Sequence, residues 1–415
     1  MISRLGRFVA ASALTNLGDG IATVAWAWAA SLLTRDPLLV ALVPVALRLP
    51  WALLALPAGI VTDRTDRRRL ILRMDIARAL AFGLAAVALA ALPVGDAPAQ
   101  GVSSPAAFGA LIAAALVVGA AEVFRDNAAQ TMLPALVPPQ ALERANGRLW
   151  SAELVGNALA GPPLGALLIA IALPVPFAAN TLAYGLAALI VASIAGQFRP
   201  ARSGPADWRA ELAEGIAFLR GSPLLMGLAW LTGMWNLFFQ MVLIALILHV
   251  QENLGLAPTA YGLVLATGAV GGIAGGLLGD RIVRRIGPAR AAQWTLATTA
   301  PCFAAIALAP GAISLGAVLF VFEFCGLVWN TVSVSTRQRM IPDGLLGRVN
   351  SAYRLLAWGM MPLGLLLSGL AVRAGAAVLP RDVALTLPFW IAAGGTCIVA
   401  AAGWRPLGRW LAPRA

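Results

Sequence analysis

Two acidic residues lie far inside apolar segments of this sequence. Asp19 falls eleven residues after Phe8, where an apolar run begins, and Glu323 falls eleven residues into the run that starts at Ala312. A helix rises about 1.5 Å per residue, so each acid would lie roughly 16 Å into its segment. A carboxylate at that depth in a membrane costs on the order of 3 kcal/mol and is usually functional. We expect Asp19 to carry protons and Glu323 to bind the substrate or a second proton.

A basic residue falls at a similar depth in the next apolar run. Arg48 lies ten residues after Leu38, where that run begins, and the run returns in the opposite direction. Its depth is therefore roughly 15 Å from the other side. Because two consecutive helices form a hairpin, we expect Asp19 and Arg48 to pair. A static structural ion pair is the alternative to a proton or substrate site.

A second group of charged residues lies nearer to one end of the following runs. It consists of Asp75, Arg78, Glu122, Arg125, Asp126 and Glu153. Asp75 and Arg78 are three residues apart, as are Glu122 and Arg125, so each pair shares one helix face. This group predicts either a contribution to proton coupling or a structural charge lock.

Aromatic and amide residues stand near Glu323 or in the seventh apolar run. They are Phe320, Phe322, Phe324, Trp230, Trp235, Asn236, Phe238, Phe239 and Gln240. An acid among aromatic rings suits a cationic or amphipathic organic molecule, so Trp235, Asn236 and Gln240 are candidate substrate contacts. Contact with lipid or with the protein core is the alternative for the aromatic residues. We interpret His249, at the outer end of the seventh run, as an ordinary interfacial residue.

The segments that carry these residues are membrane spans. The chain is 60% hydrophobic and only 12% charged, with a mean hydropathy of +0.83, whereas soluble domains carry about 25% charged residues. Twelve apolar runs are long enough to cross about 30 Å of hydrocarbon. They are Phe8–Leu33, Leu38–Val61, Leu70–Leu92, Ala107–Met132, Leu149–Ile171, Phe177–Ile194, Leu224–Val250, Tyr261–Leu278, Ala289–Ala309, Ala312–Ser335, Val349–Val372 and Val383–Gly403. The sequence predicts an all-α integral membrane protein.

The distribution of arginine predicts the orientation. The loops on one side of the twelve spans hold 22 arginines and those on the other side hold 3. Basic loops face the cytoplasm, so both termini are expected there. This asymmetry also accounts for the net charge of +12 as attraction to anionic lipid, which argues against nucleic acid as a partner.

Two internal repeats divide the chain into halves. Gly59, Asp63, Arg64, Arg67 and Arg68 recur 217 positions later as Gly276, Asp280, Arg281, Arg284 and Arg285. Leu142, Arg144 and Asn146 recur 204 positions later as Leu346, Arg348 and Asn350. We expect six-helix halves at 1–196 and 224–415, joined by a linker at 197–223. Trp208, Leu212, Ile216 and Leu219 follow helical spacing in that linker and predict an amphipathic surface helix.

The first repeat resembles the gating signature in loops 2–3 and 8–9 of the major facilitator superfamily of secondary transporters. Asp66 and Val283 stand where that signature has glycine. The resemblance implies twelve spans in two pseudo-symmetric halves, a hinge role for the repeated motif, and bracing of the cytoplasmic face by Asp63 and Asp280. The second repeat is similar to the branch that contains enterobactin-exporter-like and macrolide-efflux-like proteins.

Two further motifs bear on this resemblance. Gly161, Pro162 and Gly165 resemble the antiporter signature of the fifth span, with Ala166 in place of its last glycine. This favours an exporter, although a plain packing kink is the alternative. Arg125 lies in the span where drug antiporters often carry a coupling arginine, but its surroundings, EVFRDN, do not match their pattern.

These observations together predict proton-coupled efflux of an organic compound by alternating access. Export of a metabolite such as a siderophore is the closest alternative, and a transport-inactive membrane sensor is a weaker one. No phosphate-binding loop or hydrolase motif is present, and the three cysteines and single histidine have no metal-ligand spacing, so we expect neither an enzyme nor a cofactor. The expected partners are a small organic substrate, protons and membrane lipid, for a monomer in a bacterial inner membrane.

Overall fold

The computed structural model describes residues 3–92, 95–138, 141–199, 208–342 and 345–411. Within these ranges the side chains of Asp63, Trp208, Leu212, Leu346 and Arg348 are not described, so the predictions made for them lie outside the described residues. Throughout the described ranges the regular structure is helical and no strand occurs. The predicted all-α class is therefore confirmed.

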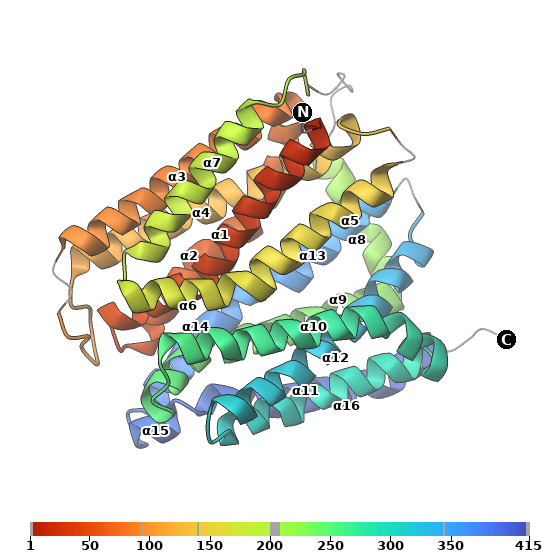
Figure 1. Ribbon diagram of the computed structural model, residues 1–415. Coiled ribbons are helices and arrows are strands. Elements are labelled where there is room, and N and C mark those ends of the chain that lie inside the picture. Colours follow the sequence, from red (N-terminus) through yellow and green to blue (C-terminus); the bar gives the residue numbers. More distant parts are fainter. Residues whose placement is uncertain (1–2, 93–94, 139–140, 200–207, 343–344, 412–415) are drawn as a thin grey trace. The chain divides into compact units, whose positions relative to one another are not determined.

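The chain forms two compact units, Met1–Ala206 and Asp207–Ala415. Unit 1 contains α1 (Arg4–Leu33), α2 (Pro37–Arg64), α3 (Arg67–Ala91), α4 (Pro105–Met132), η1 (Leu133–Ala135), α5 (Leu142–Glu153), η3 (Leu154–Ala160), α6 (Gly161–Ile171) and α7 (Val175–Ala192). Figure 1 shows α1, α3 and α7 running side by side in this unit.

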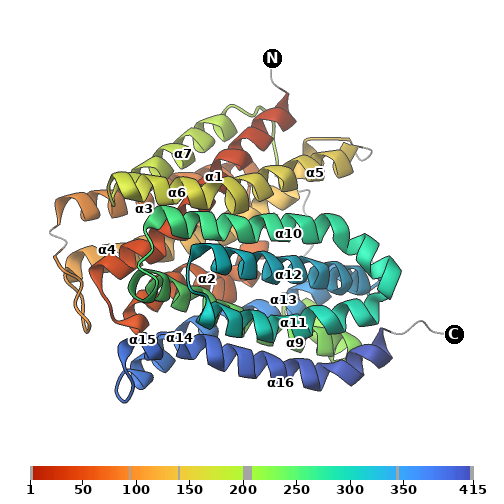
Figure 2. The same ribbon diagram turned by 60° about the horizontal axis from the view of Figure 1, so that its bottom comes forward.

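Unit 2 begins with α8 (Trp208–Gly221), which lies within the segment predicted as a linker. It continues with α9 (Pro223–Leu248), η4 (His249–Asn253), α10 (Pro258–Ile286), α11 (Pro288–Leu308), α12 (Ala312–Met340), α13 (Leu346–Gly359), α14 (Met361–Gly375), α15 (Arg381–Ala384) and α16 (Leu387–Trp410). Figure 2 shows α10, α12, α11 and α16 lying in succession.

Twelve helical segments among the described residues are long and apolar enough to cross a membrane. Six of them end before residue 193 and six begin at or after residue 223, as predicted. The fifth span of unit 1 is interrupted, because α5, the π-helix η3 and α6 follow one another there. Its counterpart in unit 2, the eleventh span, is interrupted at Met360, where α13 and α14 meet.

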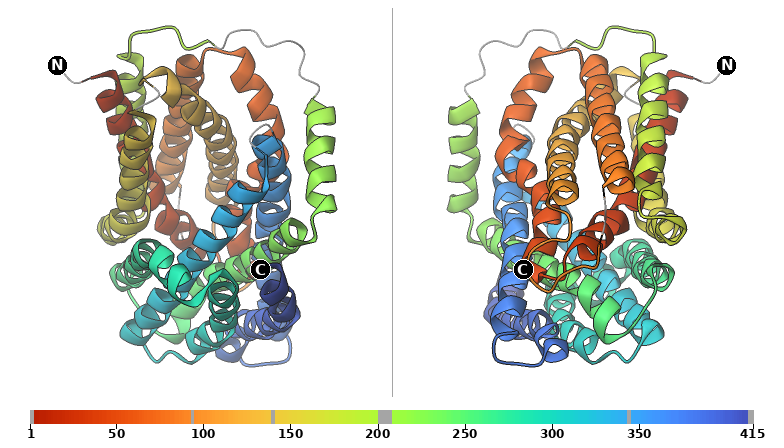
Figure 3. Two further views of the ribbon diagram at one scale, coloured as in Figure 1. Left: turned by 90° about the vertical axis from the view of Figure 1, so that its right-hand side faces the viewer. Right: turned by 90° about the vertical axis from the view of Figure 1, so that its left-hand side faces the viewer.

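The two units repeat one packing plan. In unit 1 the second span packs on the fourth, the third packs on the fourth and sixth, and the first packs on the fifth and sixth. In unit 2 the corresponding helices pair in the same way: α10 with α12, α11 with α12 and α16, and α9 with α14 and α16. The right-hand view of Figure 3 shows one of these pairs, α3 in orange beside α7 in yellow-green. The packing therefore bears out the duplication predicted from the sequence.

The repeated polar motifs are shorter interruptions than predicted. Gly59 and Arg64 belong to α2, and the whole second copy, Gly276 to Arg285, belongs to α10. Arginine is a good helix former, so a run of arginines does not by itself end a helix. Only Thr65 and Asp66 separate α2 from α3, and only Gly287, with φ of 82°, separates α10 from α11. A left-handed backbone of this kind favours glycine.

Candidate functional site

A buried arginine binds Asp19 in unit 1. Arg78 of α3 is fully buried, and its guanidinium forms an ion pair with the Asp19 carboxylate of α1. The same nitrogen of Arg78 donates to the Tyr184 hydroxyl at 2.6 Å, and that hydroxyl donates to Asp19 at 2.6 Å. The Arg78 guanidinium also lies 4.2 Å from the centre of the Tyr184 ring. Since the Asp19 side chain is 25% exposed, it is the accessible end of an otherwise buried triad.

A second buried arginine lies one step nearer to the predicted cytoplasmic end. Arg125 of α4 donates to the Thr15 hydroxyl at 2.8 Å. Its Nε lies 3.4 Å from Asp75, and its Nη1 lies 3.5 Å from Asp126. Asp75 is completely buried, and neither of its oxygens accepts a hydrogen bond of good geometry. Because a buried ionised group needs a close partner, the ion pair with Arg125 is what balances the charge of Asp75.

Direct backbone contact between α1 and the fifth span holds Asp19 in place. A Cβ atom added at Gly161 would lie 2.4 Å from the Gly20 Cα, and one added at Gly165 would lie 2.5 Å from the Ile21 carbonyl oxygen. Gly20, next to Asp19, faces the carbonyl of Asn157 in the π-helix η3. Small residues permit such close approach of helices, and π-helical turns are frequent at functional sites. The fifth-span motif thus packs beside the acid.

The predicted pairing of Asp19 with Arg48 is wrong. Asp19 pairs with Arg78, while Arg48 is exposed and, among the described residues, forms no ion pair. The depth of Asp19 along its helix does not say towards which neighbouring helix its side chain points. Since α1 packs mainly on α7 and the fifth span and only lightly on α2, its acid meets the side chains of α3 and α7 instead.

Glu122 and Glu153 border this cluster without joining it. Glu122 of α4 is half-buried and lies within electrostatic reach of Asp19, Arg78 and Arg48. Although Glu122 and Arg125 are three residues apart on α4, Arg125 pairs with Asp75 of α3. Glu153 is exposed at the end of α5. Likewise Asp75 binds Arg125, on the neighbouring helix, rather than Arg78 on its own.

Unit 2 contains a lone acid beside aromatic rings. Within the described residues no basic side chain pairs with Glu323 of α12, whose Cγ packs against Gly268 of α10. Phe322, the residue directly before Glu323, is buried and belongs to an aromatic stack: Trp235 lies parallel to it with ring centres 5.3 Å apart. Phe239 stacks on both rings, at 5.1 Å and 5.2 Å.

The two amides predicted to touch substrate are buried in unit 2. Asn236 donates to the Ala357 carbonyl oxygen at 2.8 Å, which joins α9 to α13. Gln240 is 6% exposed. Trp235 is half-buried and donates from its indole nitrogen to the Thr299 hydroxyl at 3.2 Å. Asn236 therefore has a structural bond, and Trp235 is the more accessible of the three.

In unit 1 the arginines of the first copy of the motif cap the carboxyl ends of helices. Arg67 donates to the Thr131 carbonyl oxygen at 2.8 Å, and Arg68 donates to that of Ile194 at 2.6 Å. Both acceptors lie at helix carboxyl ends, where cations are favoured. Arg7 does the same for Ser193 at 2.5 Å. This part of the motif is therefore a set of helix caps.

Asp66, in the loop between α2 and α3, accepts two backbone hydrogen bonds in unit 1. It caps α3 by accepting from the Arg69 amide at 2.9 Å, and it accepts from the Phe198 amide at 3.0 Å. Burial alone raises the pKa of the Asp66 carboxyl, but these two hydrogen bonds and the charges of Arg68 and Arg69 lower it below its ordinary value.

The second copy of the motif behaves differently. Asp280 is expected to brace the cytoplasmic face, and its carboxylate pairs with Arg284 one turn along α10. Both side chains are mostly exposed. Arg281 and Arg285 are also exposed. Because α10 continues through the motif to Ile286, Asp280 has no free helix end of its own to cap.

Sequence reasoning missed Tyr184 and Thr15, which hold the two buried arginines. Tyr184 is one of only three tyrosines in the chain and lies inside an apolar run, which is the available signal. A buried tyrosine needs a partner for its hydroxyl, and this could have directed attention to the charged residues at similar depth.

Known proteins resemble the chain along most of its length. The family model of the Major Facilitator Superfamily matches residues 8–365. The multidrug efflux pump Tap of Mycolicibacterium fortuitum is 28% identical over 397 residues, which cover 91% of each protein. The nucleoside transporter NupG has a TM-score of 0.72 at 11% identity, covering 97% of this chain and 98% of that one. A bacterial homologue of the iron transporter ferroportin in an inward-facing state has a TM-score of 0.71 at 16% identity, covering 99% of both chains. At these identities the two structures establish the fold alone.

Proposed function

Because the chain belongs to the Major Facilitator Superfamily, whose members are transporters and not enzymes, we propose that it exports an organic compound in exchange for protons. That it is a multi-pass membrane transporter follows from the family and the twelve apolar helices. The outward direction, the coupling to protons, the monomeric state and the inner-membrane location with cytoplasmic termini belong to the proposal.

The triad of Asp19, Arg78 and Tyr184 is the observation that carries this proposal. A proton that binds Asp19 removes the charge that balances the fully buried Arg78. Arg78 then needs another anion, and Asp75 and Glu122 lie within its electrostatic reach. Protonation of the accessible acid is thereby linked to a rearrangement of charges between α1, α3 and α4. Such linkage of a titrating group to two conformational states is what an antiporter requires.

The second unit supplies a candidate site for an organic cation. Glu323 has no cation of the described chain as partner, and its chain neighbour Phe322 stacks with Trp235 and Phe239. Aromatic faces and an unpaired carboxylate both attract a positively charged organic group. The relative Tap is named as a multidrug efflux pump, which agrees with this substrate class. The fifth-span motif beside Asp19 also favours an exporter, by its resemblance to the antiporter signature.

An anionic substrate such as a siderophore is the second candidate, and Arg48 favours it. This arginine lies far inside the second span, it is exposed, and it has no ion-pair partner among the described residues. A guanidinium in that state suits a carboxylate or a phenolate.

Transport in inside-out membrane vesicles tests the proposal. Cells that produce the protein and cells that lack it provide matched vesicles. Respiration, or dilution of acid-loaded vesicles into an alkaline buffer, makes the interior acidic. Uptake is measured with ethidium as cationic probe, fluorescein as anionic probe and a neutral dye. Ethidium accumulation that requires the protein and collapses with nigericin is expected. Accumulation that persists without a pH gradient would exclude proton exchange, and selective fluorescein uptake would support the anionic candidate.

A further inference from the structure

Glycines at every fourth position of α10, from Gly271 to Gly279, allow this helix to approach α12 closely. A Cβ atom added at Gly271 would lie 2.1 Å from the Phe320 carbonyl oxygen, and one added at Gly275 would lie 2.3 Å from that of Phe324. At Gly279 the nearest atom is the Thr331 hydroxyl oxygen, at 2.9 Å. The series has a period of four residues, and its next member is Val283. Because valine has a branched side chain, close contact cannot continue there.

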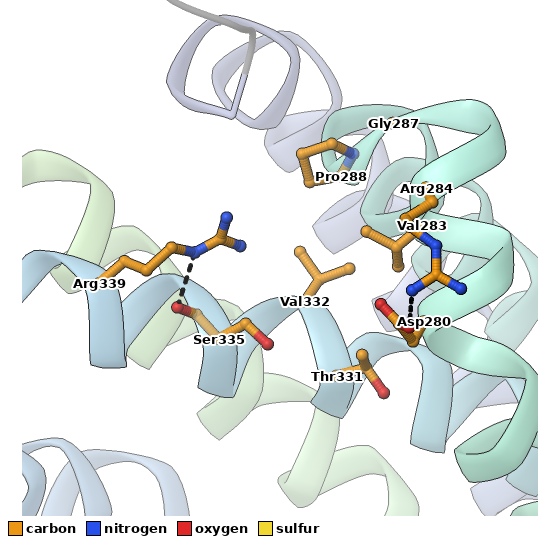
Figure 4. A pocket seen from close by; sticks show the side chains of 9 residues that line it. All are labelled: Asp280, Val283, Arg284, Gly287, Pro288, Thr331, Val332, Ser335 and Arg339. Carbon is orange, nitrogen blue, oxygen red and sulfur yellow. Dashed lines mark hydrogen bonds and ion pairs between the residues drawn. The ribbon is translucent and has the colours of Figure 1, made fainter.

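A cavity opens where the glycine series ends. Its volume is about 340 Å³, and it is bounded by the last turns of α10, the first residues of α11 and the last turns of α12. Figure 4 shows Val283 and Arg284 on one wall and Val332, Ser335 and Arg339 on the other. This cavity belongs entirely to unit 2 and is separate from Glu323 and its aromatic neighbours.

The polar groups of this cavity suit an anion. Arg339 donates from Nε to the Ser335 carbonyl oxygen at 3.1 Å, so its two terminal nitrogens are directed elsewhere, and Figure 4 shows its guanidinium towards the cavity. The only acid that lines it among the described residues, Asp280, is already paired with Arg284. The hydroxyls of Ser335 and Thr331 add short polar groups. A guanidinium with free N–H groups and nearby hydroxyls recognises phosphate oxygens well.

The position of the cavity indicates a lipid phosphate. It lies at the ends of three spans, on the side whose loops are rich in arginine and are predicted to be cytoplasmic. Large apolar side chains on the same helices are exposed: Leu277 by 78%, Ile286 by 40% and Trp294 by 61%. Basic pockets between spans on the cytoplasmic side bind anionic headgroups. We propose that this cavity binds the phosphate of an anionic phospholipid, with Arg339 as its main ligand.

Lipid binding to the purified full-length chain in detergent provides the test. Native mass spectrometry measures the affinity for phosphatidylglycerol, with phosphatidylcholine and inorganic phosphate as the comparison ligands. Arg339→Gln should weaken phosphatidylglycerol binding by about tenfold to a hundredfold, the range for a lost charged hydrogen bond. Arg409→Gln is the matched control, because it removes the same charge from an exposed position of the same unit that does not line the cavity.

A second variant separates the cavity from its charge. Val283→Phe fills the space and keeps every arginine, so it should also reduce phosphatidylglycerol binding about tenfold or more. Equal losses in the Arg339 and Arg409 variants would show diffuse attraction and overturn the proposal. Full binding by the Val283 variant would overturn it as well. Inorganic phosphate that binds as tightly as the lipid would assign the cavity to a soluble anion instead.

Discussion

Replacement of Asp19 by asparagine gives the sharpest test of proton coupling. Asparagine keeps an oxygen that can accept from Arg78 and Tyr184, but it removes the negative charge and the titration. Loss of one partner from a buried ion pair costs about 3–5 kcal/mol. The Asp19 side chain is 25% exposed, and Arg78 retains the Tyr184 hydroxyl and ring. We therefore expect a smaller destabilisation, about 2 kcal/mol, in thermal unfolding of the purified protein.

The functional effect of this substitution should be much larger than its effect on stability. In proteoliposomes with an imposed pH gradient, Asp19→Asn should reduce ethidium accumulation to the level of liposomes without protein. Ethidium binding, measured by fluorescence, should stay within a few-fold of the wild type and lose its dependence on pH. Asp96→Asn, which makes the same change in an exposed loop, should leave both quantities unchanged.

A double variant distinguishes a proton carrier from a structural partner. Asp19→Asn with Arg78→Gln removes both members of the buried ion pair, so it should recover most of the lost stability. If the pair serves only the structure, the double variant should also recover gradient-driven transport. Recovered transport, or accumulation by Asp19→Asn alone, would refute the reasoning and shift attention to Glu122.

Three other substitutions test separate parts of the structure. Asp66→Asn keeps an oxygen that can cap α3 but removes the negative charge at the start of this helix, so it should cost about 0.3–1 kcal/mol at pH 7. The pKa of Asp66 is lowered in the folded protein, so the contribution of its charge to folding stability is present above the ordinary pKa of 3.8. This contribution is lost as pH falls through the lower pKa of the folded protein. The thermal unfolding curves of the variant and the wild type should therefore converge below about pH 4. Gly161→Ala should reduce the yield of monodisperse protein in size-exclusion chromatography, since its methyl would lie 2.4 Å from the Gly20 Cα, whereas Gly185→Ala, with open space around it, should be neutral within about 1 kcal/mol. Glu323→Gln should weaken ethidium binding about tenfold and leave a neutral dye unaffected, and equal losses for both dyes would contradict a charge-specific role.

The number and pairing of the spans were accessible from the sequence for simple reasons. Hydrocarbon excludes charge over a fixed thickness, so each span produces a long apolar run. The motif from Gly59 to Arg68 recurs from Gly276 to Arg285, and this repeat predicts which span of one half corresponds to which span of the other. The packing of α2 on α4 and of α10 on α12 agrees with that correspondence.

The partners within the site were not accessible in the same way. The rise of a helix gives the depth of a side chain, but an ion pair also depends on which helix lies beside it. Asp19 and Arg48 have similar depths, yet α1 lies against α7, and Arg78 reaches Asp19 together with Tyr184. The ends of helices were also misplaced, because Gly59 to Arg64 read as a polar turn although α2 continues through them.

The arginine caps of unit 1 have a consequence for how the chain is made. Arg7 belongs to the first span, but its acceptor, the Ser193 carbonyl, is separated from it by 186 residues, and Arg68 is separated from Ile194 by 126. At ribosomal rates of about 5–20 residues per second, Ser193 is synthesised roughly 10–40 s after Arg7, so their hydrogen bond cannot form earlier. The bonds that close the bundle therefore form only when the sixth span has been synthesised. The first half can thus complete its own tertiary structure just as synthesis of the second half begins, which keeps the order of folding the same as the order of translation.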